Sequence, residues 1–166
     1  MTDDTPWLSP AQLTAWARLA GVIMTLPAAV DAQLKRDSGL NFFEYSILVG
    51  LAEEPERAVQ LSSLAQYAFG SQSRLSHAVS RLEKQGWVTR RACCNVRAIE
   101  AVLTDEGYAK LVEAAPGHVR EVRRLVIDVL SPDQIGHVDD ICRALLTVTM
   151  PNAPVLPSTA SPSDAG

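Results

Sequence analysis

Apolar residues dominate the first part of the chain, which carries almost no charge. Between Thr5 and Val30 the only charged side chain is that of Arg18. Within this segment, Ser9-Pro10-Ala11-Gln12 has the residues of a capping box, with proline at the first helical position. We therefore expect a helix to begin here and Pro27 to kink or end it. Because a helix that is apolar nearly all round must be buried, this one should pack in a core or against another chain.

Two further helices follow, separated by turn residues. Asn41-Phe42-Phe43-Glu44 is a second capping box, and apolar residues at helical spacing continue from it until Glu53-Glu54-Pro55 ends the helix. A short third helix is indicated by the apolar residues between Leu61 and Ala68, and Gly70 stops it.

The hydrophobic period then changes from that of a helix to that of strands. Ser71 caps a fourth helix, which Gly86 ends. The apolar side of this helix consists of Leu75, Ala78, Val79 and Leu82. Trp87–Arg91 and Ile99–Leu103 are typical of two strands, joined across Ala92–Ala98 as a hairpin.

The C-terminal third of the chain predicts helices that need partners. Thr104-Asp105-Glu106 begins a fifth helix, with acidic residues in the first turn, where the helix dipole favours them. Ser131-Pro132-Asp133-Gln134 is another capping box. Apolar residues three and four apart form two seams, which are Val119, Val122, Val126 and Val129, then Val138, Ile141, Leu145 and Val148. Seams of this kind pack against other helices. From Pro151 to Gly166 the composition predicts a disordered tail.

Charge is distributed unevenly along the chain. The formal net charge is −4, which alone argues weakly against a nucleic-acid partner. Between Ser71 and Ile99, however, six basic residues face one acid, Glu83, which gives +5, while the remaining nine basic and eighteen acidic residues give −9. A basic island on an acidic body suits a protein that docks one face onto DNA, although a solvated charged face is the alternative interpretation.

The order of a helix, a short helix, a capped polar-faced helix and a basic hairpin is that of a winged helix-turn-helix. The polar side of the fourth helix could reach base edges in a major groove, and a wing with cations could reach phosphates or the adjacent minor groove. The residues that we expect to contact DNA are Ser71, Gln72, Ser73, Arg74, Ser76, His77, Ser80, Arg81, Arg90, Arg91 and Arg97. We therefore predict a mainly α fold with a small β-hairpin wing.

Four stretches match one signature run. They are Leu61-Ser62-Ser63-Leu64-Ala65, Ser71-Gln72-Ser73-Arg74-Leu75-Ser76, Arg81-Leu82-Glu83-Lys84-Gln85-Gly86-Trp87-Val88 and Val102-Leu103-Thr104-Asp105-Glu106-Gly107. In combination they resemble the MarR-type transcriptional regulators, over roughly residues 9–150. The family commonly has Asp-x-Arg in its wing, whereas this chain reads Asn95-Val96-Arg97. A neutral asparagine can hold Arg97 only by a weaker hydrogen bond.

The resemblance implies a homodimer that binds double-stranded DNA as a sequence-specific regulator, more specifically a repressor. It implies a single domain over residues 1–150, with a winged helix-turn-helix at about 41–107, N- and C-terminal dimerisation helices at about 9–34 and 108–150, and a tail at 151–166. Two-fold symmetry would place the half-sites of a pseudo-palindromic operator about 10 bp apart.

The resemblance also implies a small-molecule effector, bound in a cleft between the dimerisation helices and the winged domain. Trp16, Phe42, Phe43 and Tyr45 are candidates for its lining, although aromatic residues at helical spacing are more often core. Cys93 and Cys94 lie at the predicted wing tip near arginines, and neighbouring cations can make a thiol prone to oxidation. The two cysteines are therefore either a redox sensor or incidental residues of the loop. The substitution at Asn95 and the acidic body indicate an alternative function, a dimeric ligand or redox sensor module with weak or lost DNA binding.

Other classes of protein find little support. There is no hydrolase, phosphate-loop or zinc-protease motif, so we expect no enzyme and no cofactor. The isolated His118 and His137, and Cys142 on an apolar helix, do not make a zinc site, so no metal is expected. Three cysteines, two of them adjacent, argue against a disulfide framework. An acidic N-terminus and the lack of an uncharged membrane-length run predict a cytoplasmic protein without a membrane partner.

Overall fold

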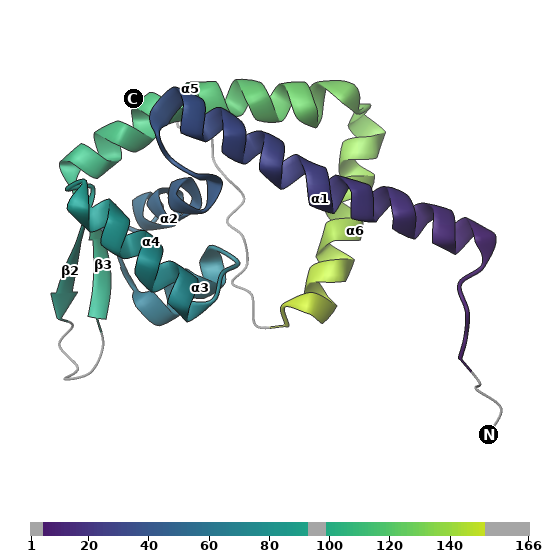
Figure 1. Ribbon diagram of the computed structural model, residues 1–166, viewed down its shortest axis with the longest axis horizontal. Helices are drawn as coiled ribbons and strands as arrows, with labels where there is room; N and C mark the ends of the chain where they lie inside the picture. Colours follow the sequence, from purple (N-terminus) through teal and green to yellow (C-terminus); the bar gives the residue numbers. More distant parts are fainter. Residues whose placement is uncertain (1–4, 93–98, 152–166) are drawn as a thin grey trace.

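The computed structural model of the chain describes residues 5–92 and 99–151. The helices and strands of this part are α1 (Pro10–Ser38), α2 (Phe42–Ala52), β1 (Ala58–Gln60), α3 (Leu61–Tyr67), α4 (Gln72–Lys84), β2 (Val88–Ala92), β3 (Ile99–Leu103), α5 (Asp105–Leu125), the 3-10 helix η1 (Ile127–Val129) and α6 (Pro132–Thr149). Helices α1 and α5 pack together along one side of the molecule, and α2, α3, α4 and the sheet lie beneath them (Figure 1). The mainly α fold with a small β wing is confirmed.

Side-chain caps fix where the long helices begin. The side chains of the five predicted N-cap residues each accept a hydrogen bond from the backbone N–H three residues later, and those residues are Ser9, Asn41, Ser71, Thr104 and Ser131. Three of these ends are full capping boxes, in which the third residue also reaches back to the cap. Each cap satisfies a backbone donor that the helix itself leaves without a partner, so the sequence positions these ends reliably.

Of the two alternatives predicted at Pro27, an end of the helix is wrong, because α1 continues to Ser38. Proline removes one backbone hydrogen bond and crowds the preceding turn, at a cost of about 3 kcal/mol. Beyond Pro27, however, Val30 and Leu34 are buried in the core, and burying two such side chains contributes about 1.5 to 3 kcal/mol each. Packing against the core therefore outweighs the local defect.

The sheet has three strands, whereas the sequence predicted only a hairpin. Strand β3 lies in the middle and pairs antiparallel with β2 on one side and with β1 on the other. β1 is only three residues long, which is too short for an alternating pattern to be visible. Its pairing ties the segment before α3 to the base of the wing and so fixes the wing relative to the helices.

Two of the turn glycines are needed for different structural reasons. At Gly86 the backbone has φ of 76°, which glycine tolerates best, and this residue follows α4 as predicted. Gly70 does not have a positive φ; instead a Cβ there would lie 2.5 Å from the Phe43 ring. The turn between α3 and α4 therefore needs glycine, because the Phe43 ring on α2 packs directly against it.

The core is built around α2 and leaves two regions of the chain uncovered. Fully buried side chains come from α1, α2, α3, α4 and β2, and include Leu34, Ile47, Leu48, Leu64 and Leu82. In contrast, α6 buries none of its residues, and α1 buries none before Val30. These two segments extend away from the rest of the molecule (Figure 1).

Helix α1 has an unusually apolar surface for an exposed helix. Within the described residues it is the one helix long and apolar enough to cross a membrane, by length and composition alone. Core helices of soluble proteins pass the same test. The exposed side of this helix is therefore apolar, and the partner expected to cover it stays a prediction.

Candidate nucleic-acid interface

Helix α4 has one side fixed in the core and the opposite side exposed to solvent. Its buried residues are Leu75, Ala78, Val79 and Leu82. With 3.6 residues per turn, the side chains that project farthest from this apolar side are Ser73, His77, Ser80 and Lys84. We call these four residues the outward line. Lys84 was missed in the sequence analysis, although its place one turn after Ser80 on the polar side could have identified it.

The first two candidates of α4 are engaged in the fold. Ser71 accepts a hydrogen bond from the backbone N–H of Arg74 at 3.2 Å. Gln72 donates from Nε2 to the carbonyl of Ser62 on α3 at 3.3 Å. Both side chains therefore hold the start of α4 in place, and their contact with DNA stays a prediction.

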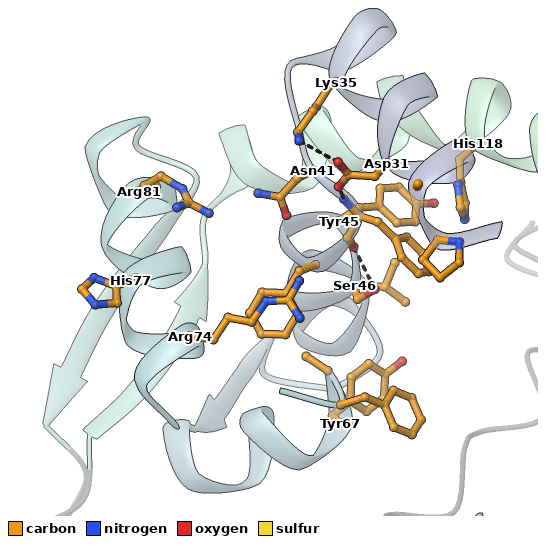
Figure 2. A pocket seen from close by; sticks show the side chains of 17 residues that line it. Asp31, Lys35, Asn41, Tyr45, Ser46, Tyr67, Arg74, His77, Arg81 and His118 are labelled. Atoms are coloured by element: carbon orange, nitrogen blue, oxygen red, sulfur yellow. Dashed lines mark hydrogen bonds and ion pairs between the residues drawn. The ribbon is translucent and has the colours of Figure 1, made fainter. Parts of the chain in front are cut away.

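The two arginines of α4 lie on the side of the helix that faces α2. The Arg74 guanidinium stacks 4.2 Å from the centre of the Phe43 ring. Arg81 donates from Nε to Oε1 of Glu44 at 2.6 Å. In Figure 2 both arginines extend from α4 toward α2, whereas His77 lies at the outer edge of the helix. The arginines thus flank the outward line and are not part of it.

The strand arginines also have partners in the chain. Arg90 donates to the carbonyl of Ser76 at 3.2 Å and to Oγ of Ser80 at 3.1 Å, and it pairs with Glu83 at 2.8 Å. These contacts join β2 to α4. Arg91 pairs across the hairpin with Glu100 at 2.9 Å.

These pairs reduce the positive charge that the sequence suggested. Within residues 71–99 the sequence contains one acid, Glu83, and six basic residues. In the structure, however, Glu44 and Glu100 from outside this stretch also pair with its arginines. Arg81 and Arg91 remain more than half exposed. The exposed part of each guanidinium group can therefore still meet a phosphate.

The wing tip lies outside the described residues. The predicted roles of Cys93, Cys94 and Arg97, and the effect of Asn95, therefore remain predictions. The structure describes the strands on either side and places them beside α4 (Figure 1).

A groove of about 1010 Å³ separates α4 from the long helices. It is lined by residues of α1, α2, α4 and α5 and of the segment after α3. Phe42, Phe43 and Tyr45 line it as expected, and Phe43 and Tyr45 are at the same time part of the core. Trp16 does not line it, because it precedes Pro27, the first lining residue of α1, by eleven residues, or about 16 Å of helix.

His118 of α5 closes one end of the groove. Its ring stacks against Tyr45, with ring centres 4.5 Å apart, and against Phe42 at 5.9 Å. Burial lowers the pKa of His118, and its Nδ1 is buried without a hydrogen-bond partner. Opposite, Asp31 accepts hydrogen bonds from Lys35 and from the backbone N–H of Phe42, which together lower the pKa of Asp31. The histidine contact was not predicted, because nothing in the sequence brings residue 118 beside residue 45.

Solved structures with this arrangement identify the family. Sco3205 of Streptomyces coelicolor, a MarR family transcriptional regulator whose structure was determined in complex with DNA, is 42% identical to this chain. The match covers 88% of this chain and 96% of Sco3205, with a TM-score of 0.85. This chain belongs to the MarR family of transcriptional regulators.

Other comparisons agree with membership of the MarR family. AbsC of Streptomyces coelicolor, another MarR family regulator, is 32% identical over 89% of this chain and all of AbsC, with a TM-score of 0.83. BldR of Sulfolobus solfataricus has the same fold at 23% identity and a TM-score of 0.70. No family model matches the sequence.

A curated relative of this MarR-family chain is the transcriptional repressor MprA of Escherichia coli K12. It is 26% identical over 116 residues, which are 69% of this chain. The match spans 65% of MprA, so the chain covers slightly less than two thirds of that relative's length.

Proposed function

We propose that this MarR-family chain is a homodimeric repressor that binds double-stranded DNA at specific sequences. The observation that carries the proposal is the outward line on α4. Four buried apolar residues fix the helix, so Ser73, His77 and Lys84 face solvent, and Ser80 lies half-buried beside them with its hydroxyl accepting from Arg90. A helix with this polarity can enter a major groove and contact base edges. That Sco3205 was solved with DNA supports the same use here.

The arginines on either side of the outward line would contact the DNA backbone. Arg74 and Arg81 lie on one flank, and Arg90 and Arg91 lie on the strand next to the other flank. When a helix lies in the major groove, its flanks approach the phosphates of the two strands. The arginines therefore position the protein, and the outward line selects the sequence.

A second copy of the chain would cover the exposed apolar surfaces. Exposed apolar residues of the N-terminal half of α1 and of α6 include Leu13, Trp16, Val22, Ile23, Val138, Ile141 and Leu145. Large exposed apolar side chains gathered on uncovered helices mark a protein interface. Two winged domains related by a two-fold axis would then contact half-sites about one helical turn of DNA apart. A cytoplasmic location is consistent with this function.

The groove beside α4 is the candidate site for an effector. It joins α1 and α5, which belong to the dimer, to the arginine side of α4, which belongs to the DNA surface. A small molecule bound there could therefore change the position of α4 and release the DNA.

Selection of duplexes from a random pool by the full-length protein tests the proposal. We expect a palindrome with half-sites about 10 bp apart to be enriched, and its affinity to fall steeply with salt. His77→Ala should change the preferred base at one position of each half-site, whereas His137→Ala on α6 should leave the preference unchanged. If no sequence is enriched at modest salt, the chain is instead a dimeric sensor without specific DNA binding.

A further inference from the structure

Among the described residues, Glu44 is one of two charged or polar residues that the core buries. It lies in the first turn of α2, and its side chain is 9% exposed. Its Oε2 accepts a hydrogen bond from the backbone N–H of Asn41 at 2.9 Å, and the Asn41 side chain accepts one from the backbone N–H of Glu44 at 2.9 Å. Two reciprocal bonds therefore hold the carboxylate in a single orientation.

The other oxygen of this carboxylate holds an arginine of α4. Glu44 Oε1 accepts from Nε of Arg81 at 2.6 Å, and the Arg81 side chain is 57% exposed. Among the described residues, no hydrogen bond engages the terminal nitrogens Nη1 and Nη2 of Arg81. The arginine is thus fixed at its base while its two-nitrogen fork is available.

We propose that Glu44 is a positioning residue for DNA binding, which holds Arg81 so that its terminal nitrogens contact a backbone phosphate. This inference rests on the proposed function. Arg81 lies on the flank of α4 and near its C-terminal end, where a helix in the major groove is closest to a phosphate strand. The planar fork of arginine matches a phosphate with two parallel hydrogen bonds.

The direction in which DNA affinity changes when Glu44 is neutralised separates this positioning role from simple charge repulsion. An acidic side chain near DNA repels phosphates, so its neutralisation should strengthen binding if charge alone matters. If Glu44 positions Arg81, its neutralisation should weaken binding, because Arg81 must then lose rotamer freedom when it meets the phosphate.

The variant Glu44→Gln separates the two effects. Glutamine also completes a capping box, so α2 keeps its N-terminal cap while the ion pair with Arg81 is lost. We expect the affinity for the duplex that the wild-type protein selects to fall about fivefold at 0.1 M salt. We also expect the slope of log affinity against log salt to become shallower by about 0.9, which corresponds to one phosphate contact.

Three further variants complete the test. Arg81→Gln should reproduce both changes, and the double variant should bind no more weakly than Arg81→Gln alone, because both substitutions remove the same contact. Glu113→Gln is the matched control: it also removes one negative charge and one ion pair, with Lys110 on α5. It should leave the affinity and the salt slope as in the wild-type protein. Circular dichroism at the assay temperature verifies that each variant is folded.

Each remaining outcome overturns the inference. Tighter binding by Glu44→Gln would show that Glu44 withholds Arg81 from DNA. Weaker binding with an unchanged salt slope would show a merely structural role for Glu44. If the wild-type protein selects no duplex, the proposed function fails, and the inference that rests on it fails with it.

Discussion

His118 is a single residue that links the stability of the fold to pH. It joins α5 to α2 through its contacts with Tyr45 and Phe42, at the end of the groove. Burial lowers its pKa below the ordinary value of 6.5, because the charged imidazolium loses hydration there. Protonation of His118 therefore acts against the packing of α2 on α5.

The consequence is a loss of stability as the pH falls below about 6.5. In that range the unfolded chain binds a proton at residue 118 that the folded chain does not, so the free energy of unfolding rises with pH. We expect the urea midpoint of the wild-type protein to decrease more between pH 7.5 and pH 5.5 than that of His118→Gln. Equal decreases in the two proteins would contradict the assignment. Protein concentration is kept constant, because a dimer is stabilised by mass action.

At the same scale, the sequence identified residue types better than it identified their partners. It selected Arg74, Arg81, Arg90 and Arg91 as surface cations, and all four are on the surface of the winged domain. That Glu44 pairs with Arg81, or that Phe43 lies under Arg74, depends on how α2 crosses α4. Such contacts join residues 37 and 31 positions apart, and no local pattern records them.

At the scale of elements, the junction between the hairpin and α5 depends on one glycine. Gly107 lies in the first turn of α5, and a Cβ there would lie 2.0 Å from the carbonyl oxygen of Trp87. The cap residue Thr104 donates to the carbonyl of Gly86 at 2.7 Å, which holds the same two segments together. The wing therefore keeps its orientation only if α5 can approach this closely.

Gly107→Ala should consequently destabilise the protein. We expect a loss of about 1 to 3 kcal/mol in the free energy of unfolding from overpacking, although alanine is otherwise the better helix former. Gly136→Ala is the control, because a Cβ at that position of α6 meets nothing within 4 Å. It should stabilise the protein by about 0.5 to 1 kcal/mol. Urea unfolding measures both, and a stabilised Gly107→Ala would show that the junction has room for a side chain.

The ends of elements were predictable where a side chain satisfies the backbone locally. The caps at Ser9, Asn41 and Ser131 required only residues three positions apart, so sequence patterns were sufficient. β1 and the passage of α1 through Pro27 depend on tertiary contacts, with β3 in one case and with the core in the other. Local propensity therefore predicted helix starts correctly and failed where packing outweighs it.

At the scale of the whole molecule, the apolar surface determines what the isolated chain lacks. The winged domain buries a complete core, but α6 buries none of its side chains in the chain alone. Ile141, in the middle of α6, is 54% exposed, and neighbouring exposed residues three and four positions away continue the apolar seam. The sequence predicted this seam from spacing alone, because the seam is a property of one helix whatever covers it.

Ile141→Glu therefore tests whether a second copy covers the seam. A buried, unpaired carboxylate is costly at an interface, so we expect the variant to be a monomer where the wild-type protein is a dimer. The matched control for the mass is Ile99→Glu, since Ile99 is 50% exposed but lies on β3, outside the helices that are expected to form the dimer. Light scattering after size-exclusion chromatography measures the mass.

Each winged domain would remain folded in the Ile141 variant, because its core does not include α6. Binding to a full palindrome should then fall at least tenfold, toward the affinity for one half-site, because the second contact is no longer intramolecular. A dimeric Ile141→Glu protein with unchanged DNA affinity would place the interface elsewhere on the chain.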